Sequence, residues 1–221
     1  MSKHLERQVD ILKQKILFVG TLVEEAIAKA ISALVNRDRN LAKQVIDEDS
    51  EIDRMEVDVE EEVLKILALY QPVAADLRFV VAVLKINNDL ERMGDLAKNI
   101  AKRVVFLTNG EKIELPSDLR PMANRAQQMV KESLDALVNA DTVMARRVRD
   151  ADDEVDSMRR QVQDFCEKQI AAHPAHTELL MRLLSVSRHL ERLADLATNV
   201  AEDVIYMVEG EIVRHRSTEA M

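Results

Sequence analysis

The fold is decided by the stretch LERMGDLAKN at positions 90–99, which returns as LERLADLATN at positions 190–199. Over 89–105 against 189–205, nine of seventeen positions are identical. A second stretch, residues 35–55, returns as residues 138–158 with its Val-Asn pair and its acidic positions in the same order. Self-similarity at a fixed offset is typical of duplicated structural units, so the sequence predicts one module of about a hundred residues that occurs twice.

Apolar residues within each copy recur at the spacing of a helix rather than of a strand. The matching stripes are Leu90, Met93, Ala97, Ile100, Val104 and Leu107 in the first copy, and Leu190, Leu193, Ala197, Val200, Val204 and Met207 in the second. Turn-forming residues interrupt this pattern and predict helices over 4–36, 38–70, 73–108, 118–139, 141–172 and 175–209.

Short connections between these helices make neighbours antiparallel. We therefore expect an all-α chain built as a tandem pair of antiparallel three-helix bundles, six helices in all, lying end to end or side by side. The predicted modules are residues 1–109 and 117–213, with the junction at 109–117, where Gly110 and Pro116 lie.

Composition agrees with long helices packed through aliphatic seams, since 47% of the 221 residues are hydrophobic, 32% are charged and only 3% are aromatic. The net charge of -9 and the lack of a basic cluster argue against nucleic-acid binding. The N-terminal segment has no signal-peptide pattern, and the longest apolar run, 79–84, is far shorter than the ~20 residues of a membrane helix. We expect a cytoplasmic protein without membrane insertion.

Four acidic pairs at i, i+4 spacing are the candidate functional residues, because each pair lies on one helix face a turn apart. They are Asp49 and Asp53, Glu91 and Asp95, Asp152 and Asp156, and Glu191 and Asp195. Like charges at this spacing destabilise a helix by roughly 0.2–0.5 kcal/mol per pair. A cation that bridges two helices would compensate this repulsion. Carboxylate donors suit magnesium, calcium, manganese or iron rather than a closed zinc site.

The alternative is that these pairs form ordinary solvated faces, with Arg92 and Arg192 neutralising the adjacent glutamates. The return of all four pairs in register favours a shared role, since neighbouring positions such as Lys98 and Thr198 have diverged. A redox di-iron bundle needs Glu-x-x-His pairs on facing helices, and none occurs. No triad ordering, phosphate loop or zinc-protease motif is present either, so we expect no enzyme.

The chain resembles the PhoU family of accessory regulators of bacterial high-affinity phosphate transport. The resemblance rests on YQPVAADLR at 70–78, DLERMGD at 89–95, its repeat HLERLAD at 189–195, and the acidic segment 42–53. It covers about residues 4–210. It implies a peripheral cytoplasmic protein that represses the phosphate-starvation response and modulates phosphate uptake, coupling the phosphate ABC transporter to a sensor histidine kinase.

The resemblance also implies metal, because some members carry iron or other cations at their E/D-x-x-x-D helices. Carried over to this chain, the ligands are Glu91 and Asp95 in the first half and Glu191 and Asp195 in the second, with the other four aspartates as facing partners. His189 in place of Asp89 and Ala194 in place of Gly94 indicate that the two patches need not bind equally.

Three functions therefore compete. The first is a regulatory adaptor, and the second is a metal-binding helical protein with a storage or enzymatic role at the acidic pairs. The third is a structural scaffold that dimerises through an apolar face. Dimerisation is compatible with the adaptor as well, so we expect a homodimer.

Overall fold

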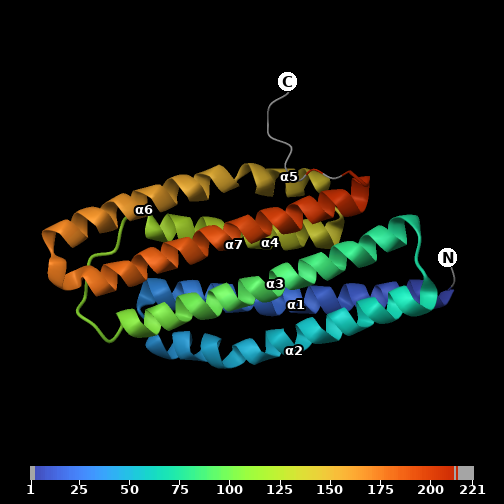
Figure 1. Ribbon diagram of the computed structural model, residues 1–221, viewed down its shortest axis with the longest axis horizontal. Helices are drawn as coiled ribbons and strands as arrows, with labels where there is room; N and C mark the ends of the chain where they lie inside the picture. Colours follow the sequence, from blue (N-terminus) through green and yellow to red (C-terminus); the bar gives the residue numbers. More distant parts are fainter. Residues whose placement is uncertain (1–2, 212, 214–221) are drawn as a thin grey trace, which may run out of the picture.

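The computed structural model describes residues 3–211 and 213, nearly all of them in α-helices (Figure 1). The helices are α1 (Lys3–Asn36), α2 (Arg39–Tyr70), α3 (Ala74–Leu107), α4 (Leu119–Asn139), α5 (Thr142–Asp150), α6 (Asp152–Ala172) and α7 (Thr177–Glu209), and a 3₁₀ turn, η1 (Pro174–His176), precedes α7. No strand occurs among the described residues. The predicted all-α class is confirmed, and the observed helices begin and end within a few residues of the predicted limits.

The predicted helix over 141–172 is interrupted at Ala151, where α5 ends and α6 begins. The Ala151 N–H donates to the Val148 carbonyl at 3.1 Å, and the Glu154 N–H donates to the Ala151 carbonyl at 3.2 Å. These i→i−3 bonds tighten the chain into a single 3₁₀-like turn. The corresponding position in the first half, Glu48, lies inside the continuous α2. The break places Asp152 in the first turn of α6.

The second helix of each half starts with the same capping chemistry. The Asp38 carboxylate accepts hydrogen bonds from the backbone N–H groups of Asn40 and Leu41 at 2.9 and 3.0 Å. The Asp141 carboxylate does the same for the two corresponding N–H groups of α5, both at 2.9 Å. Each such cap stabilises a helix by about 1 kcal/mol. The residues just before the caps, Arg37 and Ala140, share a left-handed conformation, with φ of 52° and 50°.

The two halves lie side by side rather than end to end (Figure 1). Helix α3 packs along α7, and α1 packs against α4. The Arg103 Nε donates to Ser185 Oγ at 3.2 Å, and Lys85 Nζ lies 3.5 Å from an Asp203 carboxylate oxygen. Because 103 pairs with 185 and 85 pairs with 203, α3 and α7 run antiparallel.

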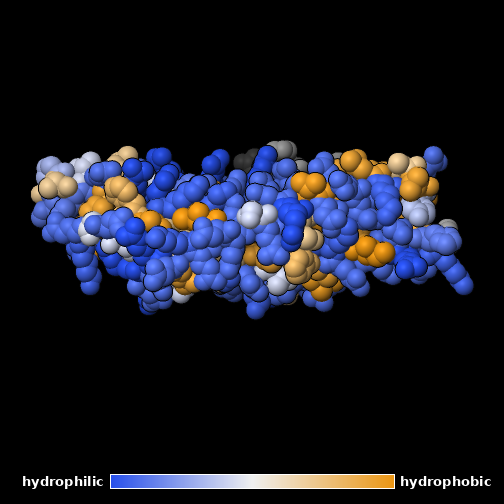
Figure 2. All heavy atoms as spheres, turned by 90° about the horizontal axis from the view of Figure 1, so that it is seen from below, coloured by the Kyte–Doolittle hydropathy of each residue, from blue (hydrophilic) through white to orange (hydrophobic). Residues whose placement is uncertain are grey.

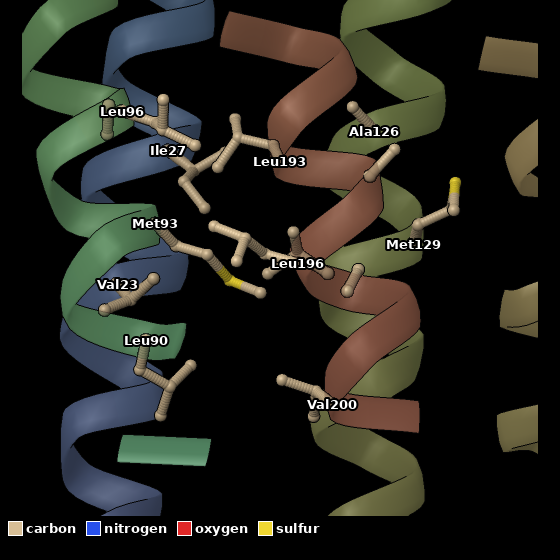
Figure 3. Packing of buried hydrophobic residues seen from close by; sticks show 14 of the residues in the cluster. Val23, Ile27, Leu90, Met93, Leu96, Ala126, Met129, Leu193, Leu196 and Val200 are labelled. Carbon is tan, nitrogen blue, oxygen red and sulfur yellow. The ribbon is translucent and has the colours of Figure 1, made fainter. Parts of the chain in front are cut away.

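One hydrophobic core extends through both halves. In Figure 3, Val23 of α1 and Met93 of α3 approach from one half, while Leu196 of α7 and Met129 of α4 approach from the other. Met93 points toward Leu196 and is fully buried. Burial of such a side chain stabilises the fold by about 1.5–3 kcal/mol. The shared core joins the two modules into one body.

The segment between α3 and α4 is held against the second half. Glu111 Oε2 lies 3.2 Å from His176 Nε2, at the turn before α7. The start of α3 is tied to the end of α7 by Arg78, whose Nε donates to the Met207 carbonyl at 3.4 Å. The predicted modules 1–109 and 117–213 flank this segment, although residues 1, 2 and 212 lie outside the described part.

Within residues 3–211 and 213, none of the helices has the length and apolar character needed to cross a membrane. The face in Figure 2 is mostly hydrophilic, and its hydrophobic side chains gather in separate spots rather than in one continuous patch.

Candidate functional site

The eight predicted acidic residues lie in two groups of four, one in each half. The first patch consists of Asp49 and Asp53 from α2 and Glu91 and Asp95 from α3. The second patch consists of Asp152 and Asp156 from α6 and Glu191 and Asp195 from α7. In each patch, two helices therefore contribute one i, i+4 pair each.

The carboxylates of the first patch are close enough to influence one another. Partial burial raises the pKa of Asp53, and the charges of Asp49 and Asp95 raise it further while Lys98 lowers it. Burial also raises the pKa of Glu91, with added repulsion from Asp95 and Asp53. These shifts show that negative charge from α2 and α3 is concentrated at one place.

A lysine bridges the two helices of this first patch. Lys98 of α3 makes a short ion pair with Asp49 of α2, which is only 6% exposed. The same ammonium lies 3.4 Å from an Asp95 oxygen on its own helix. The hydrogen bond to Asp49 raises the pKa of Lys98. A protein cation thus occupies the position between the helices.

The second patch has no lysine, and its charges are compensated differently. Burial raises the pKa of Asp152 to about 6, and the charges of Asp195, Asp156, Asp153 and Glu191 add to this increase. Burial and the Asp156 charge likewise raise the pKa of Asp195, while the charges of Arg192 and Arg159 lower it.

One arginine compensates part of the second patch. Arg159 Nε lies 2.9 Å from Glu191 Oε1. No other ion pair reaches the second patch in the described part of the chain, although the charges of Arg192 and Arg159 act on Asp195 from a greater distance.

A groove of about 580 Å³ separates the two patches where α3 passes α7. Its lining consists of four pairs of identical residues from the two repeats: Arg92 and Arg192, Asp95 and Asp195, Leu96 and Leu196, and Asn99 and Asn199. The groove therefore exposes one carboxylate of each patch, Asp95 and Asp195. The charge of the adjacent Arg92 lowers the pKa of Glu91, but burial and the neighbouring carboxylates outweigh it.

Comparison with known proteins fits this doubled architecture. The family model described as the PhoU domain matches the chain twice, at residues 16–104 and 119–204. The chain belongs to the PhoU family. The two matched segments contain all eight residues of the PhoU acidic patches.

Curated relatives cover almost the whole chain. A phosphate-specific transport system accessory protein PhoU homolog from Aquifex aeolicus is 39% identical over 96% of both chains. The phosphate-specific transport system accessory protein PhoU homolog 1 from Thermotoga maritima is 33% identical over 94% of this chain and 90% of that protein.

Solved PhoU structures share the fold. The crystal structure of PhoU from Pseudomonas aeruginosa superposes with a TM-score of 0.90 at 34% identity, covering 93% of this chain and 99% of that one. The phosphate transport system regulatory protein PhoU from Streptococcus pneumoniae gives a TM-score of 0.83 at 29% identity, with 95% and 99% coverage.

The second patch fits the hard cation that the PhoU resemblance implies. Its donors are carboxylate oxygens from two helices, which such cations prefer. Thr198, which stands where the first half has Lys98, has a buried Oγ1 without a hydrogen-bond partner among the described residues. In the present arrangement no three His, Cys, Asp or Glu side chains of residues 3–211 and 213 converge on a metal position. The second patch therefore matches a metal in the kind of its donors and not in their present positions.

The first patch fits a metal less well, because the Lys98 ammonium already lies between Asp49 and Asp95. In the sequence alone, Lys98 and Thr198 are only two positions at which the repeats differ. The contact between Asp95 and Lys98 within α3 could have been predicted, because residues three positions apart are neighbours on a helix surface. The contact with Asp49 depends on the register of α2 against α3, which the sequence does not show.

Proposed function

We propose that this chain is a negative regulator of the phosphate-starvation response. In this role it couples the high-affinity phosphate ABC transporter to a sensor histidine kinase and modulates phosphate uptake. It acts in the cytoplasm as a homodimer and catalyses no reaction of its own.

The observation that carries the proposal is the match to the PhoU family over both halves. The relatives described as accessory proteins of the phosphate-specific transport system align over more than nine tenths of this chain. The geometry supports an adaptor, since two similar bundles side by side present two related surfaces on one rigid body. An adaptor needs such a pair of surfaces to contact two partners at once.

Deletion of the gene tests the regulatory role directly. A reporter behind a phosphate-starvation promoter should become active in phosphate-rich medium after the deletion, and a plasmid copy of the chain should silence it. Removing the sensor kinase as well should return the reporter to its basal level, because the kinase carries the signal. Unchanged reporter activity in the single deletion would contradict the proposal.

Metal binding at the acidic patches is the second candidate function. It is favoured by the unpaired carboxylates of the second patch, above all by Asp152 with its pKa raised to about 6. Burial is the main cause of this raised pKa, and a bound cation would relieve the smaller part that comes from the neighbouring carboxylates. Elemental analysis of protein purified without chelator, compared with an Asp195→Asn variant, tests this function separately from the reporter.

A further inference from the structure

The turn between α2 and α3 exposes apolar side chains at one end of the bundle (Figure 1). Leu69 and Val73 are 68% and 72% exposed, and Leu77, one turn further along α3, is 40% exposed. The two residues that follow Val73 are exposed alanines. Together these side chains form an apolar tip, residues 69–77. Exposed apolar groups that gather in one place are typical of protein interaction sites.

The backbone holds the apolar tip in a defined shape. Gln71 and Ala74 have left-handed conformations, with φ of 44° and 50°, although neither is glycine. Such a conformation is costly and persists only where the surrounding structure fixes it. Pro72 is buried between them, and Arg78 anchors the base of the tip to the Met207 carbonyl of α7. A surface that is already ordered loses little entropy when it binds a partner.

The apolar tip occurs once in the chain, although the chain is duplicated. The corresponding turn of the second half, 171–176, carries two histidines. All of its residues are described, and none of them is a large exposed hydrophobic side chain. The tip therefore suits a single partner that contacts only the first half.

Acidic side chains accompany the apolar tip. Leu64 extends the apolar surface back along α2 and is 55% exposed, and Glu60 and Glu61 lie one turn before it on the same face. These two glutamates and Asp76 make no ion pair within the described part of the chain, whereas Lys65 already lies 3.2 Å from a Glu62 oxygen. The start of α1, which packs along α2, adds two basic and two acidic residues, whose charges cancel: Lys3, Arg7, Glu6 and Asp10.

This charge selects among the possible occupants of the tip. The same tip of a second copy would be repelled, and so would a surface of anionic lipids. A complementary partner has an apolar pocket with a basic rim. Cytoplasmic loops of membrane proteins carry an excess of lysine and arginine, so the cytoplasmic side of such a protein meets this requirement.

We propose that the apolar tip docks into a basic-rimmed apolar pocket on the cytoplasmic side of the phosphate ABC transporter. The proposal rests on the adaptor function put forward above and names the surface that this function uses toward the transporter. The relatives described as accessory proteins of the phosphate-specific transport system favour the transporter as this partner. Leu69, Val73 and Leu77 enter the pocket, and the neighbouring carboxylates face its basic rim.

The affinity of the full chain for the transporter, purified in detergent and immobilised for biolayer interferometry, tests the proposal. Val73→Asp should weaken binding about tenfold or more, because it places a charge in the apolar contact. Val73 is the residue just before α3, where aspartate is a favourable cap, so this variant should remain folded, as circular dichroism checks. Met181→Asp is the matched control, since Met181 is 53% exposed and lies near the start of α7, at the opposite end of the bundle (Figure 1).

A second arm of the experiment tests the charge. Glu61→Lys should weaken binding about fivefold or more at low salt, and high salt should reduce this difference, because the attraction acts between solvent-exposed charges. Asp164→Lys is the control for this arm, since Asp164 is an exposed acid of α6 without an ion pair within residues 3–211 and 213.

Several results would overturn the proposal. Equal affinity of Val73→Asp and the wild type, or an equal loss in Met181→Asp, would show that the tip is not the contact. A dimer, a vesicle of anionic lipid or the sensor kinase that Val73→Asp releases, with transporter binding intact, would identify a different occupant. Absence of transporter binding by the wild type would also reject the proposal, while the phosphate reporter would still decide separately whether the regulatory role stands.

Discussion

Gly94 and Ile52 offer a test of how the duplicated halves diverged in packing. A Cβ at Gly94 would lie 3.0 Å from Ile52 Cδ1 and 3.2 Å from Ile52 Cγ2, closer than the ~3.5–4.0 Å of an ordinary carbon contact. The second half has Ala194 at the position of Gly94, and it has the smaller Val155 at the position of Ile52. We infer that the sizes of these two side chains are coupled. Where the residue of the third helix is larger, as at Ala194, the residue that it contacts on the second helix is smaller, as at Val155.

The expected energies follow from opposing effects. Gly94→Ala gains about 1 kcal/mol of helix propensity but incurs about 1–3 kcal/mol of overpacking against Ile52. Ile52→Val alone should cost about 0.5–1.5 kcal/mol. The double variant loses the Cδ1 atom that lies closest to the new methyl group. It should therefore be more stable than the sum of the single changes by about 1 kcal/mol.

Urea unfolding followed by far-ultraviolet circular dichroism gives the four free energies of this cycle. One transition is expected, because both halves share one core. The reciprocal pair in the second half, Val155→Ile with Ala194→Gly, is the matched control and should show coupling of the same sign. Additive effects in the first cycle, within about 0.3–0.5 kcal/mol, would refute the packing argument.

Three further predictions concern charge, core and capping. Because the pKa of Asp152 is raised from 3.8 to about 6, its contribution to stability is present below pH 4 and is lost as the pH rises through 6. Asp152→Asn should therefore stabilise the metal-free protein at pH 7. The pKa shift corresponds to up to about 3 kcal/mol, and we expect about 1 kcal/mol because solvent screens this partly exposed group. A free energy of unfolding with the same pH dependence in the variant and the wild type would contradict this. Met93→Ala should cost about 2–5 kcal/mol in urea unfolding, whereas Met181→Ala, at a side chain that is 53% exposed, should cost little. Asp38→Ala and Asp141→Ala should each lower the free energy of unfolding by about 1 kcal/mol, and a loss in only one of them would contradict the equivalence of the two caps.

The fold was predictable because the internal repeat indicates two similar modules and the spacing of apolar residues indicates helices in each of them. Turn signals such as Pro72 and Gly110 placed the helix limits closely. The break at Ala151 could not be predicted, since neither Gly nor Pro interrupts 141–172 and the break consists only of a local change from i→i−4 to i→i−3 bonding.

The grouping of the eight carboxylates into two patches was predictable from the sequence, but the positions of the basic side chains that compensate them were not. Spacing along a helix indicates which carboxylates share a face, and the four i, i+4 pairs do lie on facing helices. The contacts of Lys98 and Arg159 cross between helices, so they depend on helix register and rotation. The difference between Gly94 and Ala194 suggested unequal patches, whereas the clearer difference lies four residues further on, at Lys98 and Thr198.

Recovery of partners from cells tests the central claim, that this PhoU-family chain couples phosphate transport to signalling. The tagged full chain is isolated from phosphate-replete cells after mild crosslinking, with an unrelated tagged protein as the control bait. Components of the phosphate ABC transporter and the sensor histidine kinase should both be enriched over the control. Recovery of neither partner above the control would contradict it.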